Sequence, residues 1–323
     1  MNLIRTLSGV FWKREENRPR MFWRMVIYSS SLSLVIILFS LPLGFSNILS
    51  NTFGLSFIVL IGVLLTTVIV GKWVDRRRIS DFGLIPSKVW WHEFFFGLGL
   101  GAFLMVLIFL VGWLTGSLTV VGYFQGSQQT SFLPGFLRAV GFYFAVGIYE
   151  EVILRGYILV NLAEGLKIRS VDQKWVLLLA LALSSLIFGV LHIINPNSSW
   201  VSTLNISIAG IFLGLGMVLT GRLGLSIGLH ITWNLFQGNV FGFPVSGTSS
   251  GATIISTTLT DPKWFTGGEF GPEAGVLGLF AMLLGCLLIL LWMRKRDMFS
   301  LQKGLADYDF PNQKEGIAKF ANN

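Results

Sequence analysis

The sequence has little charge and almost no cysteine. Only 12% of its 323 residues are Asp, Glu, Lys or Arg, while 53% are hydrophobic and the mean hydropathy is +0.70. Soluble domains carry roughly 25% charged residues, so the composition excludes a pair of ordinary soluble domains and favours one polytopic membrane domain. The single cysteine, Cys286, excludes an intrachain disulfide and is expected to be a small packing residue in an apolar run.

The sequence is rich in long apolar runs. Eight runs of about 17–25 residues are each long enough to cross the hydrocarbon core of a bilayer. They predict an all-α membrane bundle with about eight transmembrane helices. The spans are expected at residues 25–45, 54–71, 94–114, 135–157, 175–194, 201–220, 223–243 and 275–293.

Basic residues fall almost entirely on one side of these predicted spans. When successive connections are assigned alternately to the two sides, all of the 24 Lys and Arg residues except Arg138 and Lys263 share the side of the N-terminus. The positive-inside rule then places both termini in the cytoplasm. The net charge of +8 is therefore a topology signal, with some attraction to anionic lipid. The sequence shows no aromatic-interleaved basic patch of the kind that binds nucleic acid.

Polar segments flank and interrupt the apolar part. Residues 1–24 are expected to form a basic, interfacial cytoplasmic segment, residues 25–297 the transmembrane domain, and residues 298–323 a polar cytoplasmic tail. Residues 244–274 are rich in Gly, Ser and Thr and form the longest predicted exoplasmic loop. The absence of a convincing internal repeat argues against a transporter built from paired repeats.

Strongly polar groups inside the predicted spans are few, and they lie on three spans. Ionisable groups at membrane depth are costly, so they usually mark a functional site. The groups are Glu150, Glu151 and Arg155 in the fourth span, His192 in the fifth, and His230 and Asn234 in the seventh.

The spacing of the two glutamates predicts different roles for them. Glu151 and Arg155 are four residues apart, so they can form an ion pair on one face of a helix. Glu150 is rotated by about 100° and is left free for other work. A glutamate near a histidine, shielded from bulk water, can hold and deprotonate a water molecule, and His192 is the candidate histidine.

The third polar pair has the same helical spacing. His230 and Asn234 are one turn apart, so an imidazole and a carboxamide share a face and can donate hydrogen bonds to the oxyanion of a tetrahedral intermediate. Together with an activated water, these parts suffice for amide hydrolysis. No Ser or Cys in the set has a base at a recognisable spacing, which argues against a covalent acyl-enzyme.

The depths of two of these residues restrict the fold. If the fifth span starts near Lys174, His192 lies close to the outer surface, whereas Glu150 lies nearer the cytoplasm. The two can meet if the fourth helix is long and the fifth begins below the membrane.

Three short motifs carry a resemblance to a known family. EEVILR at residues 150–155, FGVLH at 188–192 and HITWN at 230–234 resemble the EExxxR, FxxxH and HxxxN motifs of the CPBP intramembrane proteases, also called the CAAX-protease and bacteriocin-processing (Abi) family. The order of the motifs and the eight-span layout agree as well, and the resemblance is strongest over residues 135–243. Gly189, inside the second motif, is expected to allow close helix contact.

The resemblance implies a membrane endopeptidase that cuts a membrane-bound or lipidated protein or peptide near the bilayer. An active site that opens toward the cytoplasm is expected. The implied roles are water activation by Glu150 and His192, transition-state stabilisation by His230 and Asn234, and support by Glu151 and Arg155.

The resemblance leaves the metal question open. Glu150, His192 and His230 could hold Zn²⁺ or another divalent metal with an open fourth position. The sequence has no HExxH pair, the usual helical zinc signature, and a metal-free glutamate mechanism is equally compatible with the motifs.

Two other functional classes are compatible with the same residues. A proton-coupled transporter could use the Glu and His side chains as a relay, although the absence of repeats argues against it. A non-catalytic membrane scaffold or bacteriocin-immunity protein could keep the fold of a protease, although all six motif residues are intact.

Overall fold

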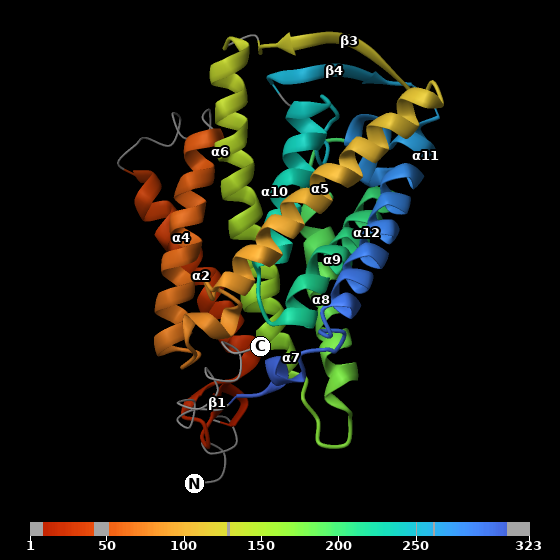
Figure 1. Cartoon of the computed structure of the whole chain (residues 1–323). Coiled ribbons are helices and arrows are strands. Elements are labelled where there is room, and N and C mark those ends of the chain that lie inside the picture. Colours follow the sequence, from red (N-terminus) through yellow and green to blue (C-terminus); the bar gives the residue numbers. More distant parts are fainter. Residues whose placement is uncertain (1–8, 42–51, 128–129, 250, 261, 309–323) are drawn as a thin grey trace.

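The computed structural model describes residues 9–41, 52–127, 130–249, 251–260 and 262–308, so parts of both predicted terminal segments lie outside the described residues. The described part is a bundle of long helices (Figure 1). Seven of its helices are long and apolar enough to cross a membrane, which identifies an integral multi-pass membrane protein. They are α2 (Met21–Ser40), α4 (Thr52–Trp73), α5 (Lys88–Leu114), α6 (Phe132–Glu151) continued to Gly165, α8 (Gln173–Leu191), α9 (Trp200–Thr220) and α12 (Val276–Lys295).

The helix expected at residues 223–243 is shorter and lies at the centre of the bundle. α10 (Gly224–Leu235) has 12 residues and continues into a π-helical stretch, η5 (Phe236–Val240). All residues of α10 up to Asn234 are buried, as expected for a helix that is enclosed by others. A Cβ on Gly101 of α5 would lie 2.6 Å from the Leu229 carbonyl oxygen, so the two helices touch through their backbones. The total of eight crossings stays a prediction, because α10 is an inner helix below full span length.

The helix expected at residues 135–157 is longer than predicted. α6 passes through a π-helical stretch, η3 (Val152–Ile158), into α7 (Leu159–Gly165), and the three form one continuous run of 34 residues. At about 1.5 Å per residue this run is roughly 50 Å long, well beyond the ~30 Å hydrocarbon core. α7 therefore projects beyond the membrane part of the bundle, at the end where α8 begins (Figure 1). This is the arrangement that the depths of Glu150 and His192 require.

A two-stranded sheet covers the opposite end of the bundle (Figure 1). β3 (Leu118–Gln125) pairs antiparallel with β4 (Thr253–Leu259), which lies in the loop expected at residues 244–274. A register shift between Val120 and Gly122 bends the pair. The remaining short elements are β1 (Trp12–Lys13), β2 (Arg18–Pro19), η2 (Ile79–Phe82), η4 (His192–Ile194), α11 (Lys263–Thr266), η6 (Gly268–Phe270), η7 (Pro272–Ala274) and η8 (Lys303–Ala306).

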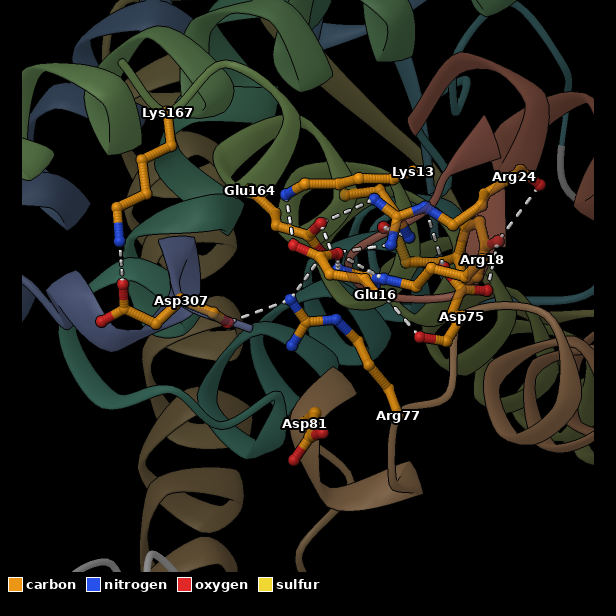
Figure 2. Close-up of polar contacts among 12 residues, drawn as sticks. Lys13, Glu16, Arg18, Arg24, Asp75, Arg77, Asp81, Glu164, Lys167 and Asp307 are labelled. Atoms are coloured by element: carbon orange, nitrogen blue, oxygen red, sulfur yellow. Dashed lines mark hydrogen bonds and ion pairs between the residues drawn. The ribbon is translucent and has the colours of Figure 1, made fainter. Parts of the chain in front are cut away.

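Three arginines converge on one glutamate at the end of the bundle that carries β1 and β2 (Figure 2). Arg24 Nη2 lies 3.0 Å from Glu164 Oε1, Arg77 Nη2 lies 2.8 Å from Glu164 Oε2, and Arg18 also pairs with Glu164. All three arginines are buried. Because they come from β2, α2 and the connection after α4, the cluster fastens these segments to α7.

The same cluster holds the last described residues of the chain. Arg77 donates to the Asp307 carbonyl at 3.0 Å, and the Asp307 carboxylate pairs with Lys167 (Figure 2). Nearby, the Tyr157 hydroxyl donates to Asp75 Oδ2 at 2.8 Å, and burial raises the pKa of Asp75. This end of the bundle is therefore held by mutually compensating charges, which are buried around Glu164 and exposed at the Lys167–Asp307 pair.

Replacing Glu164 with Gln should destabilise the protein strongly. The change leaves three buried guanidinium groups without their shared counter-charge, and breaking a buried pair costs about 3–5 kcal/mol. Thermal unfolding of the purified protein in detergent measures the loss. Glu269→Gln is the matched control, because its carboxylate is 72% exposed and lies 3.9 Å from Lys263, so the cost should stay within about 0.5 kcal/mol. Equal losses in both variants would contradict the structural role of Glu164.

Candidate active site

A cavity of about 280 Å³ lies inside the bundle. Its polar lining includes the four residues predicted to carry the chemistry, and its apolar walls include Val146, Ile206 and Phe212. Three different elements therefore bring their polar faces to one enclosed space. The four polar residues are Glu150 of α6, His192 at the end of α8, and His230 and Asn234 of α10.

A fully buried ion pair forms one side of the site. Arg155 Nη1 donates to Glu151 Oε1 at 2.8 Å, and neither side chain is exposed. Arg155 Nη2 also donates to the Gly210 carbonyl of α9 at 3.2 Å, and its guanidinium lies 4.4 Å from the centre of the Phe188 ring. Arg155 thereby joins three helices, and the pair takes the position that the i,i+4 spacing predicts.

Glu151 also orients His230, which the sequence analysis did not foresee. His230 Nδ1 lies 2.8 Å from the same Oε1 atom of Glu151. Because a carboxylate oxygen accepts, Nδ1 carries a proton and the ring cannot rotate away. His230 Nε2 is then directed to the cavity, 3.8 Å from Glu150 Oε2. The two partners are 79 residues apart, so no local spacing could reveal the contact.

The second histidine is oriented by the end of its own helix. α8 ends at Leu191, and the His192 amide bonds to the Gly189 and Val190 carbonyls rather than to the Phe188 carbonyl one turn earlier. His192 Nδ1 lies 2.8 Å from that carbonyl oxygen. Since a carbonyl only accepts, Nδ1 is the protonated nitrogen and Nε2 of the neutral ring keeps its lone pair. The FxxxH spacing thus supplies a histidine with a free acceptor nitrogen.

Glu150 differs from its neighbour in exposure. Its side chain is 21% exposed, whereas that of Glu151 is fully buried. The Glu150 carboxylate lines the cavity and remains accessible to a water molecule. Within its own motif, Arg155 donates its hydrogen bond to Glu151 and not to Glu150.

The predicted metal ligands keep only part of their donor atoms free. Among the residues that the structure describes, no group of three His, Cys, Asp or Glu side chains is placed to hold a metal ion. In the predicted set of Glu150, His192 and His230, the Nδ1 atoms of both histidines are engaged, and the closest approach of Glu150 to His230 is 3.8 Å. Both Nε2 atoms and the Glu150 carboxylate keep their lone pairs, so metal ligation by this set stays a prediction from the sequence.

The segment that builds this cavity is similar to a known enzyme family. Residues 132–236 match the family model of the type II CAAX prenyl endopeptidases, Rce1-like. The matched segment runs from the start of α6 to the start of η5 and includes all three motifs, so the resemblance to the CAAX-type proteases is confirmed over these residues. No curated protein and no solved structure matches the chain.

A buried carboxylate outside the segment that matches the CAAX endopeptidases also lines the cavity. Glu273 of η7 is 4% exposed, and its Oε2 accepts hydrogen bonds from the Ser246 amide at 2.8 Å and the Ser246 hydroxyl at 3.0 Å. Burial raises the pKa of Glu273, and the hydrogen bonds from Ser246 oppose this shift. The sequence analysis placed it in an exoplasmic loop, and no periodic pattern marks it as buried.

Gly189 of the CAAX-type FxxxH motif lies where α8 crosses α9. A Cβ at this position would collide with the Thr203 carbonyl and the Ser207 side chain and would lie 3.0 Å from the Ser207 amide nitrogen. A side chain here must push α8 away from α9, and His192 moves with the end of α8. The close helix contact expected for Gly189 is therefore present.

Gly189→Ala should reduce both stability and activity. Overpacking of this kind costs about 1–3 kcal/mol, and it displaces His192 from its place in the lining of the cavity. Gly99→Ala is the control, because a Cβ on Gly99 of α5 meets no atom within 4 Å, and it should be neutral or stabilise the helix slightly. Thermal unfolding and a cleavage assay on both variants measure the effect. If the two variants behave alike, the α8–α9 contact does not position His192.

Proposed function

We propose that the chain is an intramembrane endopeptidase that hydrolyses a peptide bond of a membrane-associated protein or peptide with a water activated by Glu150. The observation that carries the proposal is the convergence of the Glu150 carboxylate, His192 and His230 on one cavity. The match of residues 132–236 to the CAAX endopeptidase family supports it.

Glu150 and His192 act on the water in this proposal. The Glu150 carboxylate takes one proton while the water oxygen attacks the carbonyl carbon of the peptide bond. His192 Nε2 accepts a hydrogen bond from the second water hydrogen and fixes the direction of attack. Collapse of the tetrahedral intermediate breaks the C–N bond, and the proton held by Glu150 passes to the leaving nitrogen.

His230 and Asn234 face the oxyanion that forms during the attack. The Asn234 carboxamide supplies N–H donors, and His230 supplies an Nε2 donor when its ring is protonated on both nitrogens. Glu151 fixes the orientation of His230 through Nδ1. Both donors are buried, and donors that are preorganised in a buried site need no rearrangement at the moment of reaction, which makes them effective in stabilising the transition state.

Glu150→Ala and His192→Ala should each abolish cleavage while the protein still accumulates in the membrane. General acid–base catalysis contributes about 10²–10⁴-fold, so we expect a loss of at least about 100-fold. Asn234→Ala should lose about 10²–10³-fold in kcat. His92→Ala is the control, because this third histidine is exposed at the start of α5. The measurement compares the ends of membrane peptides in cells that express each variant.

Full cleavage by either Glu150→Ala or His192→Ala would refute the proposal. A cellular phenotype rescued equally by the wild type and by Glu150→Gln would favour a non-catalytic scaffold. Substrate uptake by the purified protein in liposomes would favour a transporter.

A chelator such as EDTA should leave the rate of cleavage unchanged. The expectation follows from the proposed mechanism, in which the Glu150 carboxylate itself takes the proton of the water. The assay uses the purified protein before and after dialysis against chelator. Loss of activity that added Zn²⁺ restores would show that Glu150, His192 and His230 bind a metal during catalysis.

The side of the membrane from which the substrate enters the cavity is a separate property of the site. Opening of the site toward the cytoplasm stays a prediction from the sequence. The residues that line the cavity argue for the other side of the membrane.

A further inference from the structure

We propose that the cavity opens on the exoplasmic side of the membrane and that the peptide segment it cuts is exoplasmic. That the site cuts peptides rests on the proposed function. The direction of opening rests on separate observations, namely which end of the bundle carries the basic residues and which end supplies the rim of the cavity.

The two ends of the bundle differ in charge. β1, α7 and the last described residues lie at one end, whereas β3, β4 and α11 lie at the other (Figure 1). The connections at the first end are basic: Arg76, Arg77 and Arg78 follow α4, and Lys167 and Arg169 follow α7. The positive-inside rule places this basic end in the cytoplasm.

Among the residues that the structure describes, the β3–β4 end carries two basic residues. They are Arg138, in the first turns of α6, and Lys263, the first residue of α11. An end with so few basic residues is the one that is translocated. The β3–β4 sheet is therefore exoplasmic.

The rim of the cavity is built by connections at this exoplasmic end. Asn195 follows η4, Ser246 and Thr248 precede β4, and Glu273 precedes α12, and all four line the cavity. Asn195 Nδ2 donates to the Ser246 carbonyl at 3.0 Å, and Ser246 in turn donates to Glu273. These bonds join the three connections into one rim. Thr248 on this rim is exposed.

The opposite side of the cavity is sealed. His230 lines the cavity, and Glu151 and Arg155, which are bonded behind it, complete a floor whose side chains are at most 6% exposed. Between this floor and the basic end, Leu159 of α7 and Met217 of α9 have no exposed surface. A substrate or water molecule arriving from the cytoplasm would have to cross this packed layer, whereas the rim leads directly to the Glu150 carboxylate.

The inference selects a substrate class. A lipidated C-terminus displayed in the cytoplasm reaches the sealed side of the site. A membrane-anchored or translocated protein whose exoplasmic segment lies next to the bilayer reaches the rim. The second class is the one that the geometry favours.

Cysteine labelling tests the orientation on the full-length chain. In a Cys286→Ala background, which removes the single natural cysteine, Thr248→Cys marks the rim and Ser300→Cys marks the basic end; both positions are exposed. Intact spheroplasts of an expressing bacterial host are treated with a membrane-impermeant maleimide. We expect labelling of Thr248→Cys in intact spheroplasts and of Ser300→Cys only after permeabilisation. The reverse pattern would overturn the inference.

Mapping of cleaved peptides separates this inference from the proposed function. Peptide ends present with the wild type and absent with Glu150→Ala should fall in exoplasmic segments. Ends confined to cytoplasmic segments would overturn the inference and leave the endopeptidase intact. Absence of any Glu150-dependent end would refute the endopeptidase, and cysteine labelling would still decide the orientation of the cavity.

Discussion

The arrangement of the site depends on one buried carboxylate. A charged group without exposure costs several kcal/mol unless it is paired, and Glu151 meets this requirement through a single oxygen atom. Its Oε1 accepts hydrogen bonds from Arg155 Nη1 and His230 Nδ1, both at 2.8 Å. Because Arg155 also bonds to the Gly210 carbonyl, α6, α9 and α10 must approach one another for the charges to be satisfied. The geometry of the cavity follows from that requirement.

The same network determines which groups are left to react. Arg155 and His230 both bond to the Glu151 carboxylate. Glu150 lies on another face of the helix, so its carboxylate is the one that lines the cavity. Both histidines use Nδ1 for orientation, one on Glu151 and one on the Phe188 carbonyl, and present Nε2 to the cavity. The Phe188 ring packs against both histidine rings. Its centre lies 4.6 Å from the centre of the His192 ring and 6.2 Å from that of the His230 ring. Nδ1 of each histidine thus fixes the orientation of the ring, and Nε2 is the nitrogen that is left to react.

Sequence reasoning succeeded where the decisive contact is local. The spacing of Glu151 and Arg155 predicts their ion pair because both lie on one helix, and the apolar runs predict the long helices. It failed where the contact is between distant segments. The Glu151–His230 bond and the buried position of Glu273 depend on packing, as does the ion pair between Glu93 of α5 and Arg222. Hydropathy likewise cannot show that α10 is an inner helix, because the mean hydropathy of a segment does not depend on which helices surround it in the bundle.

The distribution of charge over the two halves of the bundle has a physical reason. At the basic end, Glu164 and its three arginines lie beyond the expected hydrocarbon core. Many charged residues are tolerated there because each of them is paired with an opposite charge. Within the core, each added ionisable group is costly, so the site is restricted to a few side chains that satisfy one another. A packed apolar layer separates the two sets. Charges that fasten the bundle therefore do not perturb those that face the cavity, and the cavity is left to exchange water through its rim.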